Sequence, residues 1–248
     1  SLMNELSMKL NLNATTVTGK KLKELIKNSC TTNRDVIRPL DNPIYKEGSL
    51  AVLKGNLAPD GCVIKPAACE KKYLKHIGPA IVFNNYPEMK SMIDDEKLDV
   101  TDNHVLVLRN VGPVGGPGMP EWGMMPIPKK LLKKGVRDMV RISDARMSGT
   151  SYGACILHVA PESFIGGPLA LLKTGDLIEV DVPNRSINML VNEDEINKRR
   201  KKLKILGPKS GRGWLWIYSQ HVKQANEGCD FDFLETKFGK SASEPDIY

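Results

Sequence analysis

Short apolar runs separated by turn residues constrain the fold more than any other feature of this chain. They fill most of the sequence from residue 49 onward, and each has the length and the turn-residue boundaries typical of a β-strand. Few helical patterns lie between them, which argues against a regularly alternating, doubly wound sheet. We therefore predict a mixed α/β fold in which a strand-rich, closed or partly closed barrel is flanked by helices. The predicted strands lie within 49–56, 61–68, 79–85, 104–110, 138–143, 154–160, 177–182 and 187–191, and the last two flank a turn typical of a hairpin.

Apolar residues at helical spacing predict four helices, over 18–28, 87–97, 124–135 and 214–226. The charged segment that begins at Glu193 is predicted to form a further, exposed helix. The residues expected on the apolar faces are Leu22, Leu25, Ile26, Met89, Met92, Ile93, Ile127, Leu131, Leu132, Trp214, Ile217, Tyr218 and Val222.

The size and composition of the chain suit an ordinary soluble domain. Its 248 residues are 41% hydrophobic and 26% charged, so it can bury a sizeable core. We expect a linker over 1–17 in which Ser1 and Leu2 are a cloning remnant, one barrel domain over 18–238, and a polar tail over 239–248. A basic-then-apolar leader and a membrane-length apolar stretch are both missing from the sequence, so we expect a cytoplasmic protein without membrane contact.

The charges and the cysteines bear on three other kinds of site. The net charge is +7, but much of it lies in one basic run within 198–204, directly after the acidic residues at 193–195. Because no nucleic-acid-binding motif accompanies this run, we interpret it as a solvated helix face and expect no nucleic acid partner, with a salt-sensitive nucleic-acid patch as the alternative. The five cysteines are scattered and form no CxxC pair, so they predict neither a disulfide framework nor a zinc or iron–sulfur site.

A loop rich in glycine and proline over 110–123 is the first candidate for chemistry. Glycine lets a backbone approach a ligand closely, and proline restricts the backbone angles of a segment that would otherwise be flexible. The loop is expected to present Glu121 at the mouth of a strand, where a carboxylate can bind a hard cation such as Mg²⁺. The alternative is a plain turn in which Glu121 begins a helix.

The second candidate is the small-residue turn that exposes Ser148 beside Gly149. A serine is a poor base at neutral pH and needs a metal, a cation or a dipole to hold it as an alkoxide. No GxSxG elbow surrounds it, which weakens a hydrolase reading, and a capping role for Ser148 stays open. We interpret Asp144 and Arg146 as a local ion pair that stiffens this loop, and His158, within an apolar run, as a structural histidine.

Read together and in this order, GGPGMPEWG at 115–123 and SDARMSGT at 143–150 resemble the carboxy-terminal domain of the dihydroxy-acid and sugar-acid (aldonate) dehydratase family. The resemblance extends over 34–43, 48–61, 105–131, 158–163, 166–185 and 220–234, and so covers nearly the whole chain. The form EWGMMPIPKKL with RISDARMSGT looks more like the branch acting on aldonic acids such as arabonate and xylonate than like the valine and isoleucine branch.

The resemblance implies a fold, a reaction and site residues. The fold would be a swivelling β-barrel like that of aconitase-like enzymes, and the reaction an iron–sulfur- and Mg²⁺-dependent dehydration of an aldonic acid to a 2-keto-3-deoxy acid. Glu121 would be a magnesium ligand and Ser148 the catalytic base. The cluster ligands would lie in an amino-terminal domain of the same protein, with none in this chain, and this chain alone would be inactive. The further residues that we expect to contact substrate are Met119, Pro120, Arg146 and Thr150.

Several alternatives remain open at this stage. Within the family, they are the dihydroxy-acid dehydratase of branched-chain amino acid synthesis and a phosphogluconate dehydratase. Outside it, the alternative is a stand-alone barrel that binds a ligand or partner without catalysis. The family implies a homo-oligomer as well, but the sequence does not distinguish the substrate, the cluster type, the oligomeric state, or whether the natural gene encodes the amino-terminal domain.

Overall fold

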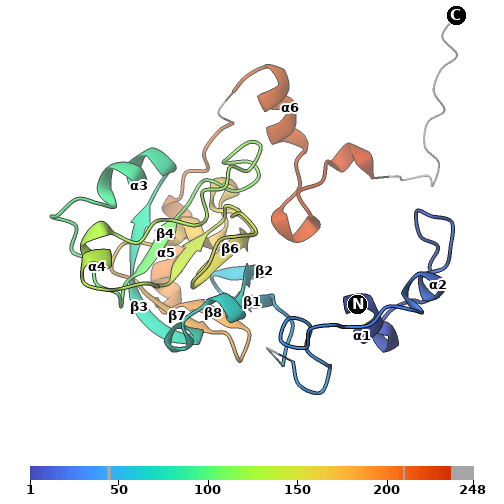
Figure 1. The fold of residues 1–248 in the computed structure, drawn as a ribbon. Helices are drawn as coiled ribbons and strands as arrows, with labels where there is room; N and C mark the ends of the chain where they lie inside the picture. The colour runs from blue at the N-terminus through green and yellow to red at the C-terminus, as the bar shows by residue number, and fades with distance from the viewer. Residues whose placement is uncertain (44–45, 209, 236–248) are drawn as a thin grey trace, which may run out of the picture. The chain divides into compact units, whose positions relative to one another are not determined.

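The computed structural model describes residues 1–43, 46–208 and 210–235, and the chain divides into two compact units over 1–49 and 50–248. The first unit contains the short helices α1 (Leu2–Glu5) and α2 (Leu22–Ile26). The second contains the whole barrel (Figure 1). The linker over 1–17 and the domain boundary at residue 18 stay predictions, and the polar tail expected over 239–248 lies outside the described residues.

Eight strands close into a barrel in the order β1-β2-β6-β5-β4-β3-β7-β8. Four neighbouring pairs are antiparallel (β1–β2, β2–β6, β3–β7 and β7–β8), and four are parallel (β3–β4, β4–β5, β5–β6 and β1–β8). The mixed barrel confirms the fold class predicted from the short apolar runs. The strands are β1 (Ala51–Gly55), β2 (Ala58–Ile64), β3 (Lys75–Phe83), β4 (Val105–Leu108), β5 (Arg141–Ser143), β6 (Cys155–Ala160), β7 (Leu177–Asp181) and β8 (Ser186–Met189).

The burial of each strand follows its place in the barrel. All four residues of β4 are buried, as expected for a parallel strand that is covered on both faces. In β7, buried residues alternate with more exposed ones, because only one face of that strand meets the core. The fully buried side chains that fill the interior include Leu53, Ile64, Phe83, Leu106, Leu108, Ile142 and Ile156.

Two helices flank the barrel where they were predicted, but both are shorter. Asn85 caps the start of helix α3 (Tyr86–Met92), because its side chain accepts a hydrogen bond from the Glu88 N–H at 2.9 Å. Met89 and Ile93 are buried as expected, whereas Met92 is exposed, because it lies at the solvent edge of the short helix. Helix α4 (Lys129–Lys133) starts only after Pro128, and it buries Leu131 while leaving Leu132 exposed. Similarly, Ile26 of α2 is buried and Leu25 is exposed.

The last two helices differ in how they relate to the core. Helix α5 (Glu193–Lys202) buries no residue, in keeping with its predicted exposure. Helix α6 (Gly213–His221) also buries none, although an apolar face was expected there; the Trp214 side chain is 67% exposed. The helix ends at His221, and Val222 is extended and buried instead. None of the described helices has the length and apolar character required to cross a membrane.

The parallel pairing of β4 with β5 positions the candidate site. The two strands pair through Leu106 with Arg141 and Leu108 with Ser143. Parallel neighbours end at the same edge of a sheet, so the loop that follows β4 and the loop that follows β5 leave the barrel side by side. These loops are the two segments that the sequence singled out, and Figure 1 shows both in green to yellow between the strands and α6.

Candidate active site

Arg146 joins the two loops that carry Glu121 and Ser148. Its Nε donates a hydrogen bond to the Met119 carbonyl at 2.5 Å, and its guanidinium lies 3.2 Å from the Glu121 carboxylate. The Arg146 carbonyl in turn accepts a hydrogen bond from the Gly123 N–H at 2.8 Å. Arg146 therefore holds the two loops of the barrel edge together next to Glu121. Among the described residues, no hydrogen bond or ion pair links Glu121 directly to Ser148.

Gly123 allows this close approach. A Cβ at this position would lie 2.3 Å from Leu157 Cδ2 and 2.7 Å from the Arg146 carbonyl oxygen. Atoms do not approach that closely without displacing backbone, so a residue with a side chain would push the two loops apart. The glycine is thus required by the contact between the loops, a reason that the sequence pattern alone did not reveal.

The buried carboxylate of Glu162 holds the glycine-rich loop in place through hydrogen bonds. It accepts hydrogen bonds from the N–H groups of Val114 at 2.8 Å and Gly115 at 2.9 Å, and from the Gln224 side chain at 2.9 Å. Burial raises the pKa of Glu162, and the hydrogen bonds from these donors oppose that rise. Gly112 is packed against the same side chain, because a Cβ there would lie 2.7 Å from the carboxylate.

The predicted ion pair between Asp144 and Arg146 is wrong. Asp144 is fully buried and accepts hydrogen bonds from the Val111 N–H at 3.1 Å and from the Ser163 N–H at 2.9 Å and hydroxyl at 2.5 Å. Arg146 turns outward to Glu121 instead. The carboxylate finds its partners in loops that lie far away in the sequence, so proximity along the chain gave the wrong partner.

Ser148 lies in a tight turn at the rim of a small hollow. Its hydroxyl is 3.1 Å from the Thr150 hydroxyl, and the Ser151 N–H donates to the Ser148 carbonyl at 3.1 Å. The turn expected at Ser148 is present, and no helix follows it directly. The hollow has a volume of about 150 Å³, and its lining includes Ile64, Lys65, Met147, Ser148, Leu157 and His158.

His158 lines this hollow and also a neighbouring one of about 380 Å³ that includes Asp60, Asn226 and Cys229. Its backbone has a φ of +56°, which is uncommon for a residue with a side chain. Burial, followed by the nearby Arg146 charge, lowers the pKa of His158, so the imidazole is held neutral. The interpretation as a structural histidine stays a prediction, although the side chain faces two cavities.

Comparison with known proteins shows the family of the chain. Residues 35–229 match the model of the dihydroxy-acid/6-phosphogluconate dehydratase C-terminal domain. The chain belongs to this family. It is 49% identical to the 6-deoxy-6-sulfo-D-gluconate dehydratase of Pseudomonas putida, 46% to the L-arabonate dehydratase of Azospirillum brasilense and 44% to a dihydroxy-acid dehydratase of Clostridium botulinum. The alignments cover 100%, 90% and 92% of this chain but only 43%, 40% and 41% of those relatives, so the chain spans about two fifths of their length.

Metal binding in a dehydratase of this family would draw on Glu121, and the fit is partial. One oxygen of the exposed Glu121 carboxylate faces Arg146, and a carboxylate is a suitable ligand for Mg²⁺, which often takes only one or two from a protein. In the part of the chain that the structure describes, no group of three or more histidine, cysteine or acidic side chains is placed to hold a metal. Glu121 therefore fits as one contributor to a site with other ligands.

The five cysteines do not fit an iron–sulfur cluster in this chain. All five are free thiols, and burial raises the pKa of Cys62 to about 12, of Cys69 to about 12 and of Cys155 to about 11. Cluster ligands are thiolates, so these three thiols are poor candidates, and among the described residues none of the five cysteines joins a group of three or more metal-binding side chains.

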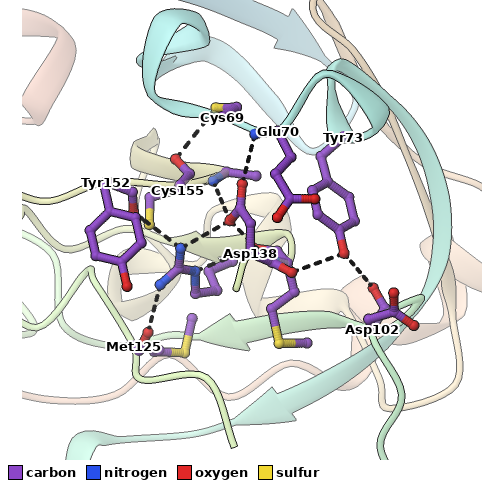
Figure 2. Close-up of polar contacts among 12 residues, drawn as sticks. Cys69, Glu70, Tyr73, Asp102, Met125, Asp138, Tyr152 and Cys155 are labelled. Atoms are coloured by element: carbon purple, nitrogen blue, oxygen red, sulfur yellow. Dashed lines mark hydrogen bonds and ion pairs between the residues drawn. The ribbon is translucent and has the colours of Figure 1, made fainter. Parts of the chain in front are cut away.

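The dehydratase loops rest on a second arginine at the other end of β5. Arg141 and Asp138 form a buried ion pair at 3.2 Å, and Asp138 also accepts hydrogen bonds from the N–H groups of Glu70 at 3.0 Å and Ala154 at 2.8 Å (Figure 2). Arg141 donates further to the carbonyls of Met125 at 3.0 Å and Tyr152 at 3.1 Å. These last two carbonyls follow Glu121 and Ser148 along the chain, so this pair fixes the far end of both loops.

Sequence reasoning found the two loops of this dehydratase domain but missed the groups that support them. Met119, Arg146 and Glu121 are brought into contact, and Thr150 contacts Ser148. Pro120 instead lines a separate hollow of about 240 Å³ with Trp122 and Leu215 of α6. The supporting residues that sequence reasoning missed are Lys65, Asp138, Arg141, Glu162, Ser163 and Gln224. A polar residue at the edge of an apolar run, as in DMVRIS, was the pattern that could have indicated them.

Proposed function

We propose that this chain is the carboxy-terminal part of a dehydratase that removes water from an aldonic acid and yields a 2-keto-3-deoxy acid. One observation carries the proposal: in a chain of this family, Arg146 fastens the loop of Glu121 to the loop of Ser148. The remainder of the active site is expected from an amino-terminal, cluster-binding domain of the same protein, and a homo-oligomer is expected as well. The full activity belongs to that complete, cytoplasmic protein.

Ser148 is proposed to accept the proton from the carbon beside the substrate carboxylate. Loss of that proton places a second negative charge next to the carboxylate, so the step requires positive charge nearby. Mg²⁺, held in part by Glu121, would supply that charge, and a cluster bound by the amino-terminal domain would supply a Lewis acid for the departing hydroxyl. Hydroxide leaves the neighbouring carbon and is released as water with a proton from the solvent, Ser148 gives the proton that it accepted back to the solvent, and the enol that remains tautomerises to the 2-keto acid.

The other predicted contacts have roles that follow from their places. Arg146 orients Glu121 and keeps the loop of Met119 against the Ser148 turn. Thr150 hydrogen-bonds to the Ser148 hydroxyl and so orients it. Arg146 holds the Met119 carbonyl, and the Met119 sulfur contacts Cys229 at 3.2 Å, which supports a role for Met119 in the wall of the proposed substrate site. Pro120 stays a predicted substrate contact, since it lines the separate hollow beside α6.

An aldonic acid is favoured over two substrates of the same family. Two of the relatives named above, at 49% and 46% identity, carry the names of sugar-acid dehydratases, and the dihydroxy-acid dehydratase follows at 44%. A phosphorylated acid would need additional cations for its phosphate. Arg146, one cation of the candidate site, is already paired with Glu121.

Assays of the full-length enzyme with arabonate, xylonate, gluconate and 2,3-dihydroxyisovalerate test this proposal. We expect turnover of at least one aldonate in the presence of Mg²⁺. Strict preference for dihydroxyisovalerate would overturn the sugar-acid assignment and favour the branched-chain dehydratase that the 44% relative represents. Inactivity towards all four, with cluster and Mg²⁺ present, would favour a barrel that binds without catalysis.

Two substitutions in the same enzyme test the residue roles. Ser148→Ala is expected to lower kcat by about 10³–10⁴-fold with an unchanged cluster content, because the base is lost. Ser151→Ala, three residues away, is the matched control and is expected to stay active, since its N–H and not its hydroxyl serves the turn. Glu121→Gln is expected to raise the Mg²⁺ concentration needed for half-maximal activity; an unchanged requirement would remove Glu121 from the metal site.

A further inference from the structure

Lys65 lies just beyond the end of β2 and reaches across to the turn that carries Ser148. Its ammonium donates hydrogen bonds to the Gly149 carbonyl at 2.7 Å and to the Ser151 carbonyl at 3.4 Å. These two carbonyls flank Thr150, whose hydroxyl contacts that of Ser148. One side chain, 84 residues earlier in the sequence than Gly149, therefore bridges the backbone directly after the proposed base.

The other contacts within this turn are local. Apart from the hydrogen bond from Lys65, Ser148, Thr150 and Ser151 bond to one another at 3.1–3.5 Å in the described part of the chain. Space around Gly149 is open, since no atom lies within 4 Å of a Cβ built there. Local bonds shape a turn but do not fix its place on the barrel. Before the serine, Arg146 attaches the chain to the Glu121 loop; after it, Lys65 attaches the chain to β2. Ser148 is thus held between two cationic anchors.

The charge of Lys65 is not neutralised by a carboxylate among the described residues, because both of its partners are carbonyl oxygens. Lys65 and Ser148 line the same hollow of about 150 Å³. A nearby ammonium favours the ionised form of an acidic group, here the alkoxide of a serine. His158 is a second titratable group that lines this hollow, and Arg146 lies on the same turn as Ser148. The Lys65 charge also acts on the Cys155 thiol, where it favours the thiolate.

We infer that Lys65 is a positioning residue for the reaction: it fixes the Ser148 turn to the barrel and keeps positive charge beside the serine oxygen. The inference rests on the proposed function for its catalytic part. Its geometric part, the anchoring of the turn, stands on the hydrogen bonds to Gly149 and Ser151 alone.

Three variants of the full-length, cluster-loaded enzyme test the inference: Lys65→Met, Lys65→Arg, and Lys71→Met as a control. Lys71 is exposed and, within the described part of the chain, forms no ion pair. Hydrogen exchange followed by mass spectrometry on the peptide that spans 147–153 measures the anchor without any need for turnover. We expect faster exchange there in Lys65→Met, near wild-type exchange in Lys65→Arg, which can still bridge two carbonyls, and no change in Lys71→Met.

Steady-state kinetics on the best aldonate then measure the catalytic part. For Lys65→Met we expect kcat to fall about tenfold or more while KM changes little, and the acidic limb of the kcat–pH profile to move up by about one pH unit. Lys65→Arg is expected to recover most of kcat. A purely structural lysine would not move the pH profile.

The outcomes separate the two proposals. Unchanged exchange over 147–153 in Lys65→Met overturns the anchor. Faster exchange with unchanged kcat and pH profile overturns the positioning role. If the wild-type enzyme dehydrates none of the four acids, the proposed function fails, and the exchange experiment still decides whether Lys65 holds the turn.

Discussion

Two arginine–carboxylate pairs flank β5, and they have the same length but opposite surroundings. Arg141–Asp138 at the start of the strand and Arg146–Glu121 beyond its end both have N–O distances of 3.2 Å. The side chains of the first pair are 1% and 4% exposed, whereas those of the second are 44% and 48% exposed. The N–O distance therefore says little about how much an ion pair stabilises the fold. Its burial and its remaining hydrogen-bond partners decide that contribution.

The buried pair acts as part of the fold and the exposed pair as part of the site. Asp138 and Arg141 both form hydrogen bonds with backbone groups from several segments. Among the described residues, no buried side-chain nitrogen or oxygen lacks a partner. Removing one member would leave the other charged and buried. Glu121 and Arg146 are about half exposed, so either could exchange its partner for a metal or a substrate, as the proposed function requires.

The largest expected effect is that of Arg141→Met. The substitution leaves Asp138 unpaired in the interior, so we expect the free energy of unfolding to fall by about 3–5 kcal/mol. Urea denaturation measures it. Arg137→Met, at an exposed neighbour that bonds the Leu132 carbonyl, is the control and should change little. A loss below about 1 kcal/mol for Arg141→Met would show that burial does not distinguish the two pairs.

Asp144→Asn sharpens the comparison, because Asp144 is buried without any cation as a direct partner. We expect a loss of about 1–3 kcal/mol from broken hydrogen bonds to Val111 and Ser163. The substitution also changes the pH dependence. Burial raises the pKa of Asp144 above its usual 3.8, so above pH 3.8 the unfolded chain loses a proton that the folded chain keeps. This group alone therefore makes stability fall with rising pH until the folded pKa is passed.

Urea unfolding at several pH values from 4 upward isolates that contribution as the difference between wild type and Asp144→Asn. Paired, partly exposed carboxyls such as Glu195 and Asp181 have lowered pKa values and give the opposite slope, but they are common to both proteins and cancel. If the two proteins show the same slope, Asp144 ionises at its ordinary pH despite its burial.

Arg199→Ala tests an intermediate degree of burial. Arg199 pairs with Asp176 and, at 2.8 Å, with Glu195, and its side chain is 12% exposed. We expect a loss of about 1–2 kcal/mol, between the values for the other two arginines. Lys198→Ala on the exposed side of α5 is the matched control. If both substitutions lower the free energy of unfolding equally, Arg199 contributes no more than its exposed neighbour. The whole basic run would then be a solvated helix face.

The smallest effect on stability is expected for Arg146→Ala. Its exposed pair contributes less than about 1 kcal/mol, and added salt should weaken it further. Turnover by the full-length enzyme should nevertheless fall, because the loops of Glu121 and Ser148 lose their link. Denaturation curves and kcat measured on the same preparation test both statements. A large loss of stability with normal turnover would reverse the roles assigned to the two pairs.

The sequence predicted elements better than it predicted their partners. The barrel followed from short apolar runs, because a strand needs little more than a local pattern to be recognised. The helix ends were less accurate: α4 begins only after Pro128, and the apolar face expected over 214–226 lies exposed on α6. A helical pattern shows which residues share a face, but whether that face meets a core depends on what packs against it.

The candidate site shows the same division. Glu121 and Ser148 were selected from their loops, and the parallel pairing of β4 with β5 brings those loops together. The pairing of Asp144 with Arg146 failed because β5 ends at Ser143, so Asp144 turns inward to Ser163 while Arg146 turns outward. Lys65 and Glu162 escaped notice because each acts on a segment far away in the sequence.

By itself, the sequence determined the class of fold and the family of the chain and selected two candidate loops, since all three are expressed in local patterns of residues. The tertiary structure decided which arginine is buried and which remains free to serve a site. That choice depends on how completely neighbouring segments exclude water from an ion pair, and such neighbours are joined only when the barrel closes.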